Sequence, residues 1–161
     1  MAREERGRFD ARDEEFMRQA IRLSALAVEH GNEPYGSVLV KDGEIVCGNE
    51  NQVLTTQDPT FHSETGLIRR FCRENGIRDL SDYTMYSSCE PCFMCSGAIV
   101  KAKLGRLVYA VSDLELGEKL GRPGAACSRI VFEHSANRPQ VDTGLLREES
   151  LEILLDYYRN H

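Results

Sequence analysis

The sequence predicts a three-layer α/β domain with helices on both sides of one sheet. Segments with helical spacing and short strand-like runs interleave along the chain, with no internal repeat and no linker. Its 161 residues match the usual size of one domain, and 41% of them are hydrophobic. No apolar run approaches the ~20 residues needed to span a bilayer. We therefore expect a single domain over residues 1–161 that is not associated with a membrane.

The first half of the chain predicts a helix, a β-hairpin and a second helix. Apolar residues recur at helical spacing until Gly31 ends the pattern. Asp42 and Gly43 separate two short apolar runs, and Asp-Gly in that position is a strong hairpin signal. Further on, Thr60 opens a helix that Gly76 ends. The expected elements are a helix at 10–30, strands at 36–40 and 45–47, a loop at 49–57 and a helix at 60–73.

The second half of the chain predicts alternating strands and helices around the cysteines. Pro91 suits the first turn of a helix, where its missing N–H costs nothing. Three glycines and a proline indicate a loop further on, with at most a short helical turn. The closing segment is amphipathic, with leucines at helical spacing. The expected elements are strands at 83–87, 107–111 and 130–132, helices at 92–102 and 142–159, and a loop at 114–128.

The charge balance favours a small neutral substrate over a nucleic acid. Lys and Arg total 20 against 26 Asp and Glu, a net charge of −6, and the sequence pI is near 5.3. Nucleic-acid binders gain much of their affinity by neutralising phosphates with basic side chains, and this chain lacks that bias overall. A local basic patch stays open as an alternative, because net charge does not report how charges are distributed.

The N-terminus and the cysteines predict a cytoplasmic protein. Residues 1–12 are dense in Arg, Glu and Asp, which is not the pattern of a secretory signal. The six cysteines are therefore expected to be reduced thiols or metal ligands rather than disulfides.

The strongest chemical signal comes from four residues: His62, Glu64, Cys92 and Cys95. Two thiolates and one imidazole can hold a zinc ion and leave its fourth position open for water, as catalytic zinc sites do. Each pair lies near the start of a predicted helix, whose positive end favours the thiolate form of the cysteines. Bound zinc lowers the pKa of its water toward ~7, and Glu64 can accept that proton. This set predicts hydrolysis at an electron-poor ring carbon, where an amino group leaves as ammonia.

Two other uses of these cysteines stay open. Cys89 extends the pattern to Cys89-x-x-Cys92-x-x-Cys95, so Cys89 and His62 could close a structural zinc site with four ligands. That interpretation leaves Glu64 unexplained. A redox Cys-x-x-Cys pair is the other alternative, although a paired His-x-Glu has no part in redox chemistry.

Three further segments surround these residues: PYGSVLV at 34–40, DPTFHSE at 58–64 and SSCEPCFMCSGAI at 87–99. His-x-Glu followed by Pro-Cys-x-x-Cys is the signature of zinc deaminases. Together these segments resemble the cytidine and cytosine deaminase superfamily, specifically its branch of free-base and tRNA deaminases. Asn51 precedes His62 by 62 − 51 = 11 positions, as does the asparagine that contacts the substrate base in this branch. The closing helix is also typical of the family.

The resemblance implies a cytidine deaminase-like fold, a three-layer α-β-α sandwich around a five-stranded mixed sheet. It further implies a homodimer with one Zn2+ per subunit, bound together with a catalytic water between two helix N-termini. It assigns catalysis to Glu64, the metal to His62, Cys92 and Cys95, and substrate binding to Asn51, Tyr35 and the backbone around Ser63 and Glu90. The alternative role of Asn51 is that of a turn former in a polar loop.

Several functions compete within and beyond this family. The first is a deaminase of a small free nucleobase, of the cytosine or guanine type, which the acidic pI supports. A tRNA adenosine deaminase is the alternative, but residues 113–119 do not match its expected loop and the closing helix is acidic. A deaminase of a nucleoside or of a related amino-heterocycle is a further alternative. Phe61 and Ser63 replace the commoner alanines of the motif, which alters the packing beside the metal. A zinc-stabilised binding module is the non-enzymatic alternative.

Overall fold

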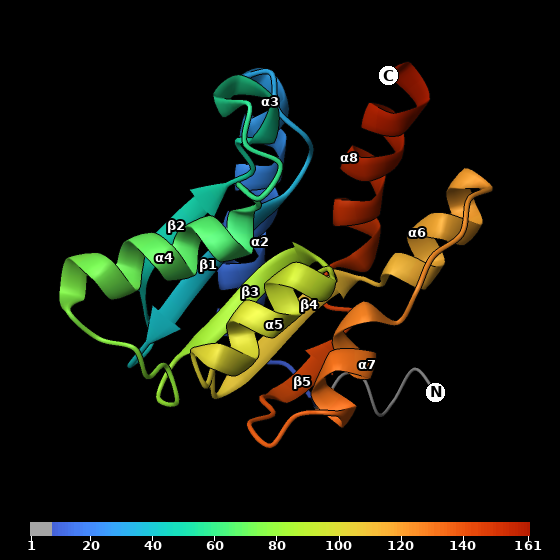
Figure 1. Ribbon diagram of the computed structural model, residues 1–161. Helices are drawn as coiled ribbons and strands as arrows, with labels where there is room; N and C mark the ends of the chain where they lie inside the picture. Colours follow the sequence, from blue (N-terminus) through green and yellow to red (C-terminus); the bar gives the residue numbers. More distant parts are fainter. Residues whose placement is uncertain (1–7) are drawn as a thin grey trace.

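A five-stranded mixed sheet forms the centre of the computed structural model, which describes residues 8–161 (Figure 1). Its strands are β1 (Gly36–Lys41), β2 (Glu44–Glu50), β3 (Thr84–Cys89), β4 (Arg106–Val111) and β5 (Gln140–Thr143). They lie in the order β2-β1-β3-β4-β5. Strand β1 pairs antiparallel with β2 and β3, and β4 pairs parallel with β3 and β5. The expectation of a mixed sheet of five strands is confirmed.

Helices cover both faces of this sheet, which confirms the expected three-layer sandwich (Figure 1). They are α2 (Ala11–Glu29), α3 (Val53–Thr56), α4 (Ser63–Asn75), α5 (Phe93–Lys101), α6 (Asp113–Leu120), α7 (Cys127–Glu133) and α8 (Arg147–Asn160). Helices α2, α6 and α8 share one hydrophobic cluster with the sheet, and α4, α5 and α7 share a second. Successive side chains of a strand point to opposite faces of the sheet. In β1, Val38 accordingly belongs to the first cluster and Leu39 to the second. Within residues 8–161, no helix combines the length and the apolar run that crossing a membrane requires.

Glycine is required in the β1–β2 turn and at the point where α2 packs on β1. Asp42 and Gly43 both have positive φ angles, 50° and 74°, as a two-residue type I′ turn requires. The predicted hairpin is therefore confirmed. At Gly36 a Cβ atom would collide with the backbone of α2 at Ala20 and Ser24. Only glycine lets the helix pack this closely on the strand.

The predicted loop at 114–128 is wrong over its first part, because the structure forms α6 there. The hydroxyl of Ser112 accepts the Glu115 N–H at 3.2 Å and caps the helix. Gly117 lies inside α6, where a Cβ would press on the backbone of Gly124. Glycine at this position thus lets the following chain pass close to α6, and it does not mark a loop.

The predicted strand at 130–132 is also wrong, because these residues belong to α7. A short apolar run does not distinguish a strand from a buried helix segment, and here Phe132 packs in the core whereas Ile130 is exposed. The fifth strand is β5, whose residues the prediction placed at the start of the final helix or just before it. The predicted loop at 49–57 contains the single turn of α3.

A buried polar network joins α2 to three strands of the sheet. Asp13 is 7% exposed, and its carboxylate accepts hydrogen bonds from the Tyr86 hydroxyl at 2.6 Å and from Arg106 at 2.9 Å. Arg106 also donates to Asp142 on β5 at 3.0 Å. Burial opposes the ionisation of Asp13, but hydrogen bonds from Tyr86, from the Asp10 backbone and from Arg106 outweigh it and lower its pKa.

We expect Asp13→Asn to lower the free energy of unfolding by about 2 kcal/mol at pH 7, because it removes a charged acceptor from three donors. The pKa of Asp13 is lower in the folded protein, so its contribution is complete above the ordinary carboxyl pKa and disappears as the pH falls through the folded value. The difference between wild type and variant should therefore narrow in acid. Urea unfolding at pH 7 and at pH 3 measures it. Glu14→Gln, on the exposed side of α2, is the matched control, and an Asp13→Asn midpoint equal to that control would contradict the expectation.

Candidate active site

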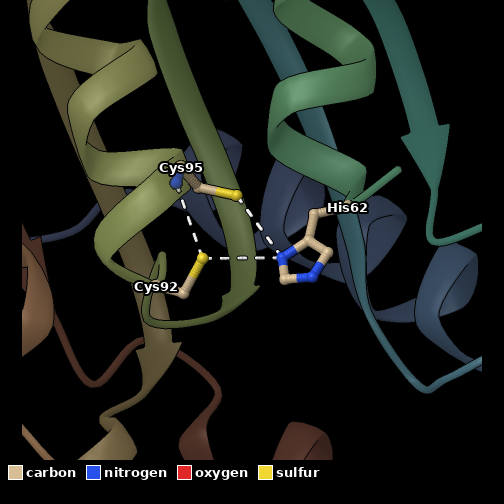
Figure 2. Close-up of side chains that lie close together, drawn as sticks. All are labelled: His62, Cys92 and Cys95. Atoms are coloured by element: carbon tan, nitrogen blue, oxygen red, sulfur yellow. Dashed lines mark hydrogen bonds between the residues drawn. The ribbon is translucent and has the colours of Figure 1, made fainter. Parts of the chain in front are cut away.

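Two helix N-termini bring the predicted metal ligands together (Figure 2). Helix α4 begins at Ser63 with His62 as its N-cap, and α5 begins at Phe93 with Cys92 as its N-cap. Both helices start later than predicted. Before α4, the Asp58 carboxylate accepts the Thr60 N–H and closes a turn of its own. His62 and Cys92 therefore stand at the helix ends, where free N–H groups and the helix dipole favour negative charge.

The three donor atoms have the spacing of a tetrahedral zinc site. His62 Nδ1 lies 3.5 Å from Cys92 Sγ and 3.6 Å from Cys95 Sγ, and all three atoms lie within 4.8 Å of one another. With Zn–S bonds of about 2.3 Å and a Zn–N bond of about 2.0 Å, tetrahedral angles place N and S about 3.5 Å apart. The residues present thus fit zinc in both chemistry and distance.

Hydrogen bonds among the three donors shift their pKa values. A side-chain hydrogen bond from Cys95 is the main cause that lowers the pKa of Cys92, and His62 adds to the effect. The hydrogen bond with Cys92 in turn raises the pKa of His62. The same thiol pair, together with burial, raises the pKa of Cys95. A metal cation would displace these protons, because it binds the thiolates and the neutral imidazole.

Cys89 does not join this group. Among the described residues, the donor cluster contains His62, Cys92 and Cys95 and neither Cys89 nor a carboxylate. Cys89 is buried at the end of β3, and burial raises the pKa of its thiol. The geometry therefore excludes a structural site closed by Cys89 and leaves three protein ligands, the number found in catalytic zinc sites.

Glu64 lies in the first turn of α4, next to the donor cluster and 5% exposed. The Ser87 hydroxyl, fully buried on β3, donates to Glu64 Oε1 at 2.6 Å. The Ser87 Oγ also lies 2.8 Å from the Cys89 carbonyl oxygen. Ser87 can therefore donate to the Glu64 carboxylate, or donate to the carbonyl and accept from a protonated Glu64.

Asn51 and Tyr35, the two side chains expected to contact the substrate, lie side by side. The Asn51 N–H donates to the Tyr35 carbonyl at 3.0 Å, and Asn51 is 1% exposed. Its Oδ1 accepts the Val53 N–H at 3.0 Å and its Nδ2 donates to Glu33 at 3.4 Å. The side chain of Asn51 thus also forms the turn bond that the alternative interpretation expected. Its substrate contact stays a prediction.

Ser63 and Glu90 are both buried, and the Glu90 side chain is hydrogen-bonded within the protein. Ser63 is fully buried, its carbonyl accepts from Asn49 at 3.0 Å, and its hydroxyl has no hydrogen-bond partner within the described residues. The Glu90 carboxylate accepts from the Asp113 N–H and from both the N–H and the hydroxyl of Ser128. Glu90 therefore anchors the starts of α6 and α7. Any substrate contact of these two residues would have to come from their backbone, as the resemblance implies.

Two residues beside the site, Ser87 and Tyr158, were not predicted from the sequence. Ser87 lies on β3, two residues before Cys89. It reaches Glu64 because of the face of β3 that it occupies, and the sequence alone does not show that face. Tyr158 lies near the end of α8, and its hydroxyl hydrogen-bonds to that of Tyr35. The Arg122 guanidinium lies 4.6 Å from the Tyr158 ring centroid. No local pattern predicts that pairing, because Tyr35 and Tyr158 are 123 residues apart.

Comparison with known proteins agrees with this geometry. The family model of the cytidine and deoxycytidylate deaminase zinc-binding region matches residues 10–111. The chain belongs to this family. It is a deaminase of the cytidine deaminase superfamily with a zinc-binding domain.

Relatives of this deaminase include a guanine deaminase and tRNA-specific adenosine deaminases. It is 41% identical to the guanine deaminase of Bacillus subtilis (strain 168) over 106 residues, 65% of this chain and 68% of that enzyme. It is 33% identical to a tRNA-specific adenosine deaminase of the same organism over 147 residues, 91% of this chain and 89% of that one.

Solved structures similar to this chain include proteins of both kinds. A structure from work on A-to-I editing by tRNA:A34 deaminases has a TM-score of 0.75 and 32% identity, covering 87% of this chain and 99% of that one. The Bacillus subtilis guanine deaminase structure has a TM-score of 0.64 and 32% identity, covering 95% and 96%.

Proposed function

We propose that this deaminase replaces the exocyclic amino group of a free nucleobase, of the cytosine or guanine type, with a carbonyl and releases ammonia. The observation that carries the chemistry is a buried carboxylate, Glu64, held by Ser87 beside three metal donors that leave a fourth position free. This arrangement combines a proton carrier with a site for a Lewis acid.

The proton transfers fall to Glu64. It takes a proton from the attacking water, delivers it to a ring nitrogen, and later helps to protonate the departing amine. Water supplies the carbonyl oxygen, and the hydroxyl group formed on the ring carbon gives up the second proton. The bond between that carbon and the exocyclic nitrogen then breaks, and the amino group leaves as ammonia. Zinc held by His62, Cys92 and Cys95 would supply the Lewis acid that lowers the pKa of the attacking water. Asn51 and Tyr35 are the proposed contacts to the ring, together with the backbone around Ser63 and Glu90.

Ser87 is a positioning residue for Glu64 in this scheme. We expect Ser87→Ala to lower kcat by about 10- to 100-fold, because a buried carboxylate loses a charge-assisted hydrogen bond. The zinc content and KM should stay near the wild-type values, because Ser87 does not belong to the donor cluster. Steady-state kinetics with metal analysis measures this, and Ser87→Thr, which keeps the hydroxyl, is the control. Equal kcat values for Ser87→Ala and the wild type would remove Ser87 from the mechanism.

The surface of α8 supports a small neutral substrate. Glu148, Glu152 and Asp156 line a groove on this helix, and Tyr158 of the same helix lies against Tyr35 of the proposed pocket. Phosphate groups that approached along α8 would meet like charge.

The second candidate function is tRNA adenosine deamination, and two observations favour it. The tRNA-specific relatives match about nine-tenths of the chain. Helix α4 exposes Arg69, Arg70 and Arg73 around a hollow of about 650 Å³, where phosphates could bind. A deaminase of a nucleoside or a related amino-heterocycle remains a further candidate.

Ammonia release from a panel of substrates separates these functions. The zinc-loaded protein is incubated with cytosine, guanine, adenine, their nucleosides and tRNA, and ammonia is quantified. Release from cytosine or guanine supports the proposal. Release from tRNA alone, together with tRNA binding that weakens steeply with salt, would establish the second candidate instead.

A homodimer forms part of the proposal. Phe93 and Met94 on α5 and Ile130 on α7 are 51%, 37% and 44% exposed, and the two helices cover the same face of the sheet. Large exposed apolar side chains next to each other mark an interaction surface. Sedimentation equilibrium should give twice the chain mass of 18.2 kDa, and a monomer at micromolar concentration would contradict the dimer.

A single domain over residues 1–161 and a cytoplasmic location complete the proposal. One sheet with one pair of hydrophobic clusters supports the single domain. All six cysteines are free thiols, which supports a reducing compartment. A single cooperative unfolding transition and cell fractionation test the two statements.

A further inference from the structure

Glu33 places a carboxylate next to the proposed substrate-binding residues. It lies between α2 and β1, is half-buried, and its Oε2 accepts from Asn51 Nδ2 at 3.4 Å. After burial, the charge of Glu33 contributes to the raised pKa of Tyr158. Glu33 therefore stands within electrostatic reach of the end of α8.

The neighbours of Glu33 along the chain hold it in place. Asn32 is 3% exposed, and its side-chain oxygen accepts the N–H groups of Leu54 and Thr55 in α3. Pro34 is buried, and the Tyr35 N–H donates back to the Glu33 carbonyl at 2.9 Å. The backbone of Glu33 is thus fixed before any ligand binds, as a recognition site requires.

The Glu33 carboxylate lacks the partners that a half-buried charge needs. Within residues 8–161, no lysine, arginine or histidine forms an ion pair with it. Its contact with Asn51 is long for a hydrogen bond. Because Asn51 Oδ1 is used by the Val53 N–H, the amide presents N–H groups on the side of Glu33. A donor and an acceptor therefore stand next to each other.

We propose that Glu33 accepts the ring N–H at which a nucleoside would carry its sugar, and so restricts this deaminase to free bases. The inference rests on the proposed nucleobase function, and it deepens that function by naming the group that distinguishes a base from its nucleoside.

Base chemistry matches this pair of groups. Free cytosine presents its N1–H beside O2, and free guanine presents its N9–H beside N3. In each base an N–H suits the Glu33 carboxylate, and the adjacent acceptor suits the Asn51 amide. A sugar or a methyl group on that nitrogen removes the proton and sets carbon against the carboxylate. A site built to bind an N–H rejects analogues that lack it, because its own polar group is then left unpaired.

The test compares the binding of each base with that of its ring-methylated form. The zinc-loaded Glu64→Gln protein, whose turnover is expected to be slower by about 10² to 10⁴-fold, is titrated with cytosine and 1-methylcytosine, and with guanine and 9-methylguanine. We expect the free base to bind about 10²-fold tighter than its methylated form. Adding Glu33→Gln should reduce this ratio to within a few-fold. Glu44→Gln, an exposed carboxylate at the far end of the β1–β2 hairpin, should leave the ratio unchanged.

The outcomes separate this inference from the proposed function. If the free base still binds about 10²-fold tighter than its methylated form in the Glu33→Gln variant, the inference is overturned. An equal loss of affinity for both ligands would also overturn it, because Glu33 would then only orient Asn51. Wild-type protein that releases ammonia from free bases in either case would leave the proposed function standing. A wild type that releases ammonia from tRNA and from no free base would remove the proposed function itself.

Discussion

Replacing Glu64 with Gln should abolish most turnover while leaving the metal in place. Gln has the same shape but cannot accept and release a proton, so kcat should fall by about 10² to 10⁴-fold. Glu64 lies outside the group of three metal donors. The variant should therefore purify with one zinc per chain and unfold at a temperature close to that of the wild type. Steady-state ammonia release and metal analysis on the same preparation measure both properties.

The matched control for this variant is Glu74→Gln, at the exposed end of the same helix α4. It removes the same charge from the same helix, away from the donor cluster, and should keep wild-type kcat. A Glu64→Gln protein that is as active as Glu74→Gln would favour the alternative of a zinc-stabilised binding module, in which no side chain moves protons.

The substitution Cys92→Ser should remove the metal, the activity and part of the stability together. A serine hydroxyl does not ionise near neutral pH, so the site would keep two good donors, His62 and Cys95. Zinc affinity should fall by several orders of magnitude, and turnover should fall to background. Since metal binding stabilises the folded state, the loss should also lower the unfolding temperature of protein purified in zinc.

The control for the metal is Cys47→Ser, on β2, where the sulfur accepts from Arg70 and has no part in the cluster. It should keep stoichiometric zinc and full activity. Stoichiometric zinc in Cys92→Ser, measured by plasma mass spectrometry, would contradict the assigned ligand set.

Much of the fold could be predicted because its signals are local. The Asp42-Gly43 turn has the two left-handed residues that a tight hairpin needs. Helix α2 carries a clear helical periodicity, and β1 and β4 are short, largely apolar runs. The wrong predictions lie between residues 113 and 143, where contacts between residues distant in the sequence determine the secondary structure. Gly117 lies within α6 at a point where the returning chain leaves no room for a Cβ, and β5 forms by parallel pairing with β4, where Asp142 also contacts Arg106.

The metal donors were predictable for a different reason. His62, Cys92 and Cys95 lie at fixed offsets from two helix starts, so a short motif carries their geometry. Ser87 and Tyr158 could not be found in this way, because each contacts a partner that is distant in the sequence: Glu64 for the first and Tyr35 for the second. Local patterns identify the candidate metal ligands, and tertiary packing identifies the residues that contact the site from other elements.

Deamination in ¹⁸O-labelled water tests the central claim most directly. The zinc-loaded wild-type protein is given cytosine or guanine in labelled water, and mass spectrometry of the product is combined with an ammonia assay. We expect one ¹⁸O atom in each new carbonyl group and one ammonia per product. Conversion without the label, or no conversion of either base by protein that holds stoichiometric zinc, would contradict the account.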